Sequence, residues 1–173
     1  DEINNMSILP WPSLDFSKFG ETELKSLSRI KKISGQNLYR NWVKIPHVTQ
    51  FEEADITDLE SFRKKTNIAL SESGVKLTIL SFIIKASYFA LRKYRDFNSS
   101  LDEKNNNLII KNFYNIGFAA DTPTGLIVPV IKNIDKKGIV DIAKEMSNLS
   151  SFGRQGKLKP SDMQGATFTI SSL

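Results

Sequence analysis

The sequence of 173 residues has no cysteine and a single histidine, His47. Without cysteine the chain can form no disulfide framework, no thiolate metal site and no cysteine nucleophile. One histidine also excludes a metal site built from two histidines of the same chain, and we expect no metal cofactor. A Ser-His-Asp triad would depend on His47, which follows Pro46 at the start of an extended stretch. A structural role is the simpler interpretation of that residue.

Long apolar runs are missing as well. Stretches without charge are short, such as residues 122–131, which also contain two prolines, whereas a membrane-spanning helix needs roughly 20 apolar residues. The N-terminus, Asp1-Glu2, lacks the basic and apolar pattern of a signal peptide. We therefore expect no membrane partner and a reducing, cytoplasmic location.

Charge of one sign is not concentrated anywhere in the chain. The 24 Lys and Arg residues exceed the 19 Asp and Glu residues and leave a net charge of +5, but acidic residues lie between the basic ones. A nucleic-acid surface would show clustered Lys and Arg with aromatic or glycine residues among them, so no nucleic-acid partner is expected. An unrelated basic binding domain stays open as an alternative, and salt-dependent binding to DNA or RNA would be its mark.

What is present is the composition of a globular protein, with 40% hydrophobic and 25% charged residues. Residues 1–20 contain Pro10-Trp11-Pro12, which is incompatible with regular helix, and are predicted to be the tail of a linker. Phe16 and Phe19 are expected to anchor this segment to a surface. Residues 21–173 are predicted to form one domain.

The spacing of apolar residues predicts three helices followed by a sheet. Steps of three and four between Leu24 and Trp42 indicate an amphipathic helix. Thr57, followed three residues later by Glu60, has the spacing of a capping box that begins a second helix, and Thr78 is the expected cap of a third. The expected strands cover residues 108–113, 114–120, 126–131 and 166–172, with a fourth helix over residues 139–149. This order predicts a mixed α/β domain, an α+β arrangement in which helices flank one sheet.

The C-terminal half carries three more local signals. Asp121–Gly125 has the composition of a tight turn. Pro129 lies inside an expected strand, which indicates a sheet edge or a bulge. The strand at 166–172 is of the buried type, whereas chain ends are usually polar, so we expect the domain to be incomplete at the C-terminus. No phosphate-loop, dinucleotide, nucleophile-elbow or zinc-protease motif occurs.

Four segments follow one another in an order that matches a known family. They are residues 29–49, which end in I-P-H-V-T and run into residues 55–63 (D-I-T-D-L-E-S-F-R), residues 97–101 (F-N-S-S-L), residues 116–130 (I-G-F-A-A-D-T-P-T-G-L-I-V-P-V) and residues 163–172 (M-Q-G-A-T-F-T-I-S-S). Together they resemble the catalytic domain of dihydrolipoamide acyltransferases, the E2 components of 2-oxo acid dehydrogenase complexes. Residues 9–20 are most similar to the acetyltransferase branch of bacterial pyruvate dehydrogenase complexes.

The resemblance implies a chloramphenicol acetyltransferase-like α/β fold that forms a homotrimer and, in many bacteria, a larger cubic core. It implies that an acetyl group moves between dihydrolipoamide and coenzyme A, which are both substrates, with no metal. It also implies that the E1 and E3 components of the complex are partners, reached through domains that this chain does not contain. Succinyl or branched-chain acyl specificity remains an alternative, as does an assembly module without activity whose strand edges are exposed.

The resemblance also assigns roles to individual residues. Ser171 matches the serine of the family's F-T-I-S segment, which stabilises the oxyanion of a tetrahedral intermediate. Arg63 matches a recurrent arginine and is a candidate for the phosphates of coenzyme A, with a solvated helix charge as the other interpretation. Thr124 and Gly125 lie in a turn that resembles a family signature near the active-site channel, and they could equally be required by the turn itself.

One departure from the family limits these expectations. The family's catalytic histidine lies in a D-H-R-x-x-D-G motif beyond the F-T-I-S strand, and the 173 residues do not contain that motif. His47 matches the histidine of P-H-V-T and not the general base. In the family the serine and the histidine of one site come from different subunits. The chain is therefore expected to be the N-terminal two-thirds of a catalytic domain and to be inactive alone.

Overall fold

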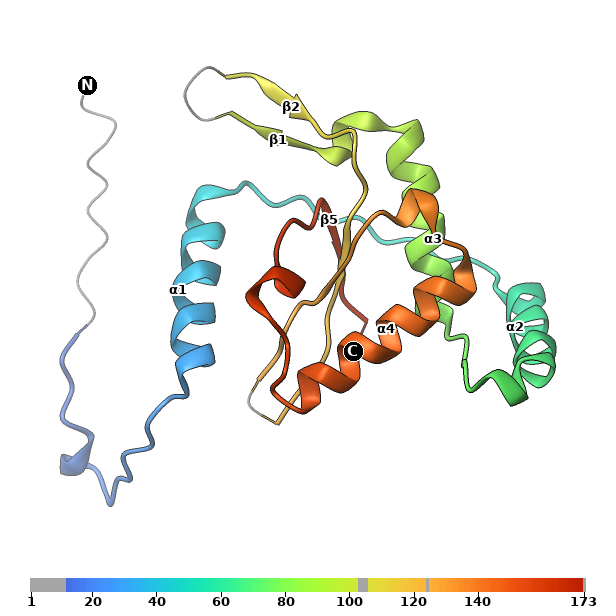
Figure 1. The fold of residues 1–173 in the computed structure, drawn as a ribbon. Helices are drawn as coiled ribbons and strands as arrows, with labels where there is room; N and C mark the ends of the chain where they lie inside the picture. The colour runs from blue at the N-terminus through green and yellow to red at the C-terminus, as the bar shows by residue number, and fades with distance from the viewer. Residues whose placement is uncertain (1–11, 103–105, 124, 173) are drawn as a thin grey trace.

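The computed structural model describes residues 12–102, 106–123 and 125–172. Its centre is a three-stranded sheet of β3 (Ile116–Phe118), β4 (Val130–Ile131) and β5 (Phe168–Ile170) in the order β4-β3-β5. β3 pairs antiparallel with β4 and parallel with β5. Helices α3 (Ile79–Lys93) and α4 (Ile139–Arg154) lie beside this sheet (Figure 1). The mixed sheet with flanking helices confirms the predicted α/β class.

The core forms where α3 and α4 meet the sheet. Its main cluster joins side chains of α3, β3, β4 and α4, and five isoleucines in it are fully buried: Ile84, Ile116, Ile131, Ile134 and Ile142. A smaller cluster of Leu77, Phe82 and Ala143 extends the core toward α2. Burying an aliphatic side chain contributes roughly 1.5–3 kcal/mol, so these clusters hold the sheet and the two helices together.

The prediction of one sheet is wrong. β1 (Ser99–Leu101) and β2 (Leu108–Ile110) form a separate antiparallel hairpin (Figure 1). Asn98, which is buried, donates from Nδ2 to the carbonyl oxygens of Lys111 (2.7 Å) and Phe113 (3.1 Å). These bonds hold the segment after β2 in a bend, so the chain turns before it enters β3. The predicted strand over 114–120 is accordingly limited to β3.

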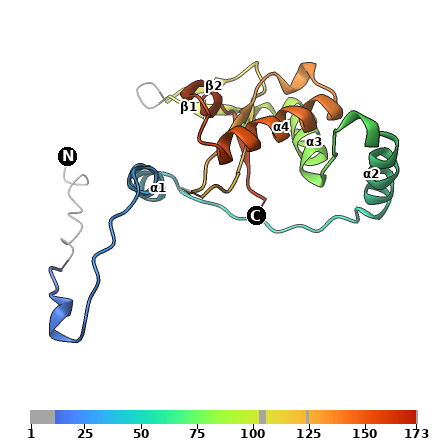
Figure 2. The ribbon, with the colours of Figure 1, turned by 60° about the horizontal axis from the view of Figure 1, so that its bottom comes forward.

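The first helix lies apart from the core. α1 (Arg29–Lys44) begins at the Ser28 cap, whose hydroxyl accepts from the N–H of Lys31 at 3.3 Å, and not at Leu24 as predicted. Residues 45–56 then run as an extended segment to α2 (Thr57–Ala69) on the other side of the molecule (Figures 1 and 2). Phe16 and Phe19 are 64% and 85% exposed, so they do not anchor the N-terminal segment to this chain.

The predicted caps of α2 and α3 need correction. Ile56 occupies the cap position of α2, and the Asp55 carboxylate accepts from both the N–H (2.9 Å) and the hydroxyl (2.6 Å) of Thr57. These two bonds lower the pKa of Asp55, with the side-chain bond as the larger cause. Thr78 does precede α3, but its hydroxyl makes no cap bond. Among the described residues, no helix combines the length and the apolar character needed to cross a lipid bilayer.

Candidate active site

Ser171 is the first residue after β5. The parallel register pairs Gly117 with Thr169 and Phe118 with Ile170, and the next bond of the ladder runs from the N–H of Ala119 to the carbonyl of Ile170 at 3.0 Å. Ser171 therefore lies where β3 ends and the chain enters its next turn. Its side chain is exposed, which leaves the hydroxyl accessible to a ligand.

The turn that follows β3 is the tight turn expected from its composition. Ala120 and Ile127 exchange both backbone hydrogen bonds, at 2.9 and 3.0 Å. Inside the turn the Thr122 hydroxyl donates to the carbonyl of Gly125 at 2.6 Å, and the N–H of Gly125 donates to the carbonyl of Thr122 at 3.1 Å. Gly125 has φ +136°, which side-chain-bearing residues rarely adopt. Thr124 lies outside the described residues.

Two of the predicted site elements therefore lie at the same end of the sheet. Ser171 follows β5 and the Thr122–Gly125 turn follows β3, and the two strands run parallel. Because parallel strands end at the same edge, the chain brings Ser171 and the turn to one end of the sheet although about 46 positions separate them. The backbone conformation of the turn is enough to explain why residue 125 is a glycine. The φ of Gly125 therefore gives no separate support to a role beside the substrate channel.

A groove of about 710 Å³ lies beside this turn. α1 forms one wall, and residues around the end of α4 form another. Gly153 lets α4 approach the segment that follows this turn, since a Cβ there would be 2.5 Å from Cδ1 of Ile127. The polar side chains on its surface include Ser34, Asn37, Thr122 and Gln164. The sequence offered no sign of this groove because its walls come from separate parts of the chain.

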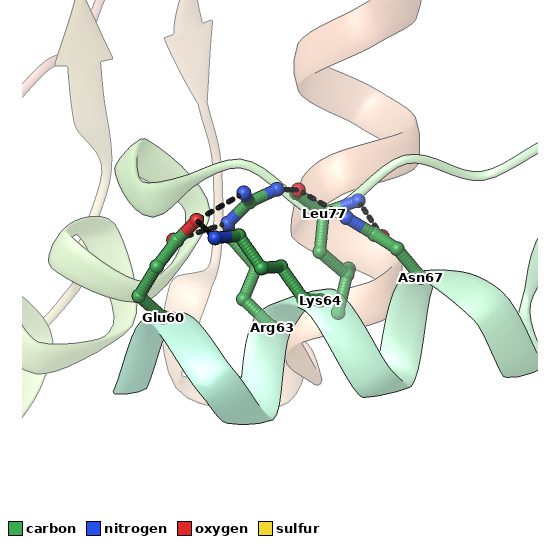
Figure 3. A network of polar contacts seen from close by, with 5 residues as sticks. All are labelled: Glu60, Arg63, Lys64, Asn67 and Leu77. Atoms are coloured by element: carbon green, nitrogen blue, oxygen red, sulfur yellow. Dashed lines mark hydrogen bonds and ion pairs between the residues drawn. The ribbon is translucent and has the colours of Figure 1, made fainter. Parts of the chain in front are cut away.

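Arg63 belongs to a different region. Its guanidinium donates from Nε to Oε2 of Glu60 (2.7 Å), from Nη2 to Oε1 of Glu60 (2.7 Å) and from Nη1 to the carbonyl of Leu77 (3.1 Å) (Figure 3). Asn67 completes the network, because it donates to the same carbonyl at 3.0 Å and accepts from the N–H of Leu77 at 2.8 Å. The network fastens α2 to the segment that leads into α3.

The same contacts explain the electrostatics of the network. The hydrogen bonds from Arg63, more than the positive charges of Arg63 and Lys64, lower the pKa of Glu60 from 4.5 to about 2. Glu60 in turn raises the pKa of Arg63, mainly through the same hydrogen bonds. The spacing of three residues between Glu60 and Arg63 on one helix could have predicted this pair.

The structure does not bring Arg63 to Ser171. α2 lies beyond α3 and α4 when seen from the three-stranded sheet, in both views of the ribbon (Figures 1 and 2). His47 is also elsewhere: it follows α1, and its ring stacks on Trp42 with 5.3 Å between ring centroids. In the described part of the chain, no three His, Cys, Asp or Glu residues gather as metal ligands.

A family model covers most of the chain. Residues 19–173 match the model of the 2-oxoacid dehydrogenases acyltransferase (catalytic domain). The chain belongs to this family. A curated member, the dihydrolipoyllysine-residue acetyltransferase component of the pyruvate dehydrogenase complex of Cupriavidus necator, is 60% identical over 168 residues, which are 97% of this chain. The chain spans about 30% of the length of such curated relatives.

Solved structures of the family share the fold. One is dihydrolipoamide acetyltransferase of Azotobacter vinelandii, in an investigation of the role of a serine, a histidine and an asparagine in its catalytic mechanism. Another is the cubic core of the pyruvate dehydrogenase multienzyme complex. Each is 48% identical, with a TM-score of 0.93 over 96% of this chain and 68% of the solved one. The acyltransferase family expected from the four sequence segments is therefore confirmed.

Proposed function

We propose that this chain forms the serine side of an acetyl-transfer site in a pyruvate dehydrogenase complex, with dihydrolipoamide and coenzyme A as substrates. The observation that carries the proposal is the exposed Ser171 hydroxyl at the shared end of β3 and β5. The identity of 60% with an acetyltransferase component supports the substrate class. A serine and a histidine are also the subject of the mechanistic study of the Azotobacter vinelandii relative.

In the proposed reaction a base removes the proton of the coenzyme A thiol, and the thiolate attacks the carbonyl of the acetyl thioester. The electron pair of the carbonyl moves onto its oxygen, and the Ser171 hydroxyl donates a hydrogen bond to that oxyanion. Collapse of the intermediate expels the dihydrolipoamide thiolate, which takes up a proton, and leaves acetyl-coenzyme A. Ser171 thus stabilises charge and is not the nucleophile.

The base of this reaction comes from outside the 173 residues. His47 is their one histidine, and its ring is engaged with Trp42 after α1. Without a base the thiol stays largely protonated near neutral pH. We therefore propose that the 173-residue chain is inactive alone and gains activity when a histidine segment of the family type is supplied by the rest of the protein or by a neighbouring subunit.

Two further site assignments belong to the same proposal. Three of the five N–H donors of Arg63 are used in its bonds to Glu60 and Leu77. The two remaining N–H groups would donate to a phosphate of coenzyme A. Thr124 and Gly125 would border the substrate channel beside Ser171. Because Arg63 is remote from Ser171 in one chain, its phosphate contact requires that coenzyme A extends along a neighbouring subunit.

For the assembly we propose a homotrimer that builds a larger cubic core, with the E1 and E3 components as partners through other domains. Residues 1–20 would be the linker toward those domains, and residues 21–173 part of the catalytic domain. Support comes from the apolar side chains that α1 and residues 45–56 leave in solvent: Trp42 is 76%, Val48 84% and Phe51 88% exposed. Large exposed apolar surfaces mark protein interfaces.

Ser171→Ala in the full-length protein tests the proposal. Acetyl transfer from acetyl-coenzyme A to dihydrolipoamide should slow about 10²–10³-fold, the loss typical of a missing oxyanion donor. Ser172→Ala, which changes the neighbouring exposed serine, is the matched control and should leave the rate within about 2-fold. A wild-type rate in Ser171→Ala would refute the role of Ser171. Faster turnover of succinyl or branched-chain thioesters would refute the acetyl specificity alone.

A further inference from the structure

Asn115, the residue before β3, lies between two backbone segments with unusual conformation. Its Oδ1 accepts from the N–H of Asn133 at 2.9 Å, and its Nδ2 donates to the carbonyl of Gly165 at 2.9 Å. Asn133 and Gly165 both have positive φ, at 53° and 83°. One amide side chain thus holds the turn after β4 on one side and the approach to β5 on the other.

The backbone of Asn115 holds the same approach. Its carbonyl accepts from the N–H of Thr167 at 2.7 Å and from the Thr167 hydroxyl at 3.2 Å. Its N–H reaches the same hydroxyl at 3.4 Å. The next two residues are Ile116 and Phe168, the first pair of the β3–β5 ladder. The contacts of Asn115 therefore lie directly before the ladder and set which residues pair in it.

β5 depends on such a device more than other strands. It has three residues, and among the described residues it pairs with β3 alone, at the edge of the sheet. A slip by one residue would exchange the faces to which its side chains point. Ser171 follows Ile170 directly, so a slip of β5 would move its hydroxyl away from the position it now has beside the end of β3.

We propose that Asn115 is a positioning residue for the Ser171 hydroxyl. Its side-chain amide fixes Gly165 relative to Asn133, and this fixes the register of β5. Asn115 does not touch the substrates in this scheme, because its amide bonds are directed to the backbone at the opposite end of β5 from Ser171. The inference rests on the proposed role of Ser171 but makes a separate statement about β5.

Asn67 provides a matched control. It also clamps a backbone segment with one donated and one accepted bond, to Leu77 at 3.0 and 2.8 Å. It lies on α2, and its bonds hold the lead into α3 and not β5. Replacing either asparagine by alanine removes the same kind of clamp, but only Asn115→Ala should displace the Ser171 hydroxyl.

The kinetic test uses the full-length protein. Asn115→Ala should lower kcat about 10–100-fold, because small displacements of a catalytic group have effects of this size, and should change KM for coenzyme A by less than about 2-fold. Asn115→Asp retains the oxygen that accepts from the N–H of Asn133, so it should lower kcat less than Asn115→Ala does. Asn67→Ala should keep kcat, and any effect through Arg63, which shares the Leu77 carbonyl with Asn67, should fall on KM for coenzyme A. In a Ser171→Ala background, Asn115→Ala should cause no further loss, since the group it positions is already absent.

Hydrogen exchange separates this inference from the proposed function. The backbone amides of Thr167 and β5 should exchange faster in Asn115→Ala than in wild type. In Asn67→Ala their exchange rates should equal those of wild type. The inference would be overturned if Asn115→Ala left both the exchange of β5 and kcat at wild-type values. It would also be overturned if Asn115→Ala lowered kcat by the same factor in wild type and in the Ser171→Ala background. Faster exchange at normal kcat would overturn the positioning role as well. If Ser171→Ala itself were fully active, the proposed function would fail, while exchange would still report on the clamp.

Discussion

The helices α1 and α3 have 16 and 15 residues and both carry apolar residues at helical spacing, but α3 is the more apolar of the two and they contribute to the fold in different ways. α3 buries five residues, and Ile84 and Leu91 among them contact the sheet cluster. α1 buries none, and Trp42 and Leu38 are 76% and 67% exposed. Apolar residues at helical spacing thus predict a helix but not the surface that will cover it.

The two regions also differ in what holds them. The core around α3 is fixed by burial of fully enclosed side chains in contact with β3, β4 and α4. The N-terminal arm, which we define as residues 12–56, is fixed by local bonds such as the Ser28 cap and by the limited contact of α1 with the Gly125 turn, where Ile30 is the neighbour. In the proposed trimer, a second copy would cover the exposed side of the arm.

The largest effect in this comparison is expected from Ile84→Ala in α3. Loss of a fully buried isoleucine should reduce the free energy of unfolding by about 2–5 kcal/mol, measured by urea denaturation. Trp42→Ala in α1 is the control from the arm and should change it by less than about 0.5 kcal/mol in the dissociated chain. Equal losses for the two variants would mean that α1 is packed in the chain and would remove the contrast.

A smaller effect is expected from Ser28→Ala, which removes the cap of α1. Caps of this kind contribute about 1 kcal/mol to a helix, and because α1 buries no residue, the loss should appear as local fraying. Circular dichroism should show less helix, while the urea midpoint of the core stays the same. A midpoint that falls together with the helix signal would show that the arm and the core unfold as one unit.

The smallest effect concerns the α2 junction between these regions. The folded pKa of Glu60, about 2, lies below its ordinary value of 4.5, so the carboxylate stabilises the fold above about pH 4.5. That stabilisation should be lost as pH falls from 4.5 toward 2. Urea midpoints across this range should show a steeper acid decline for wild type than for Glu60→Gln, which carries no titrating group there. Parallel curves would show that Arg63 does not hold Glu60 in solution.

Several elements of the fold follow from short stretches of sequence. The apolar spacing predicted α3 and α4, and the composition of Asp121–Gly125 predicted the turn that the Thr122–Gly125 bonds close. Pro129 predicted a sheet edge, and β4 is an edge strand. In each case the deciding interactions are made within a few residues along the chain. The acyltransferase family was likewise recognised from local motifs.

The prediction of one sheet failed because contacts across the chain decided it. β1 and β2 pair only with each other among the described residues, and Asn98 bends the chain after β2 through its bonds to the carbonyls of Lys111 and Phe113. The contacts of Arg63 likewise include Leu77 as well as Glu60, which the sequence did not predict. The roles proposed for Ser171, Arg63, Thr124 and Gly125 remain predictions that the variants above can test.

Local spacing and motifs were enough to predict the presence of the helices, the position of the tight turn and the family, because these properties depend on residues close together in the chain. Contacts between distant segments place Ser171 at the same end of the sheet as the turn after β3, place Arg63 on the far side of α3 and α4, and let Asn115 join the turn after β4 to the approach to β5. These arrangements depend on strand pairing between segments far apart in the chain, and local propensity carries no information about such pairing.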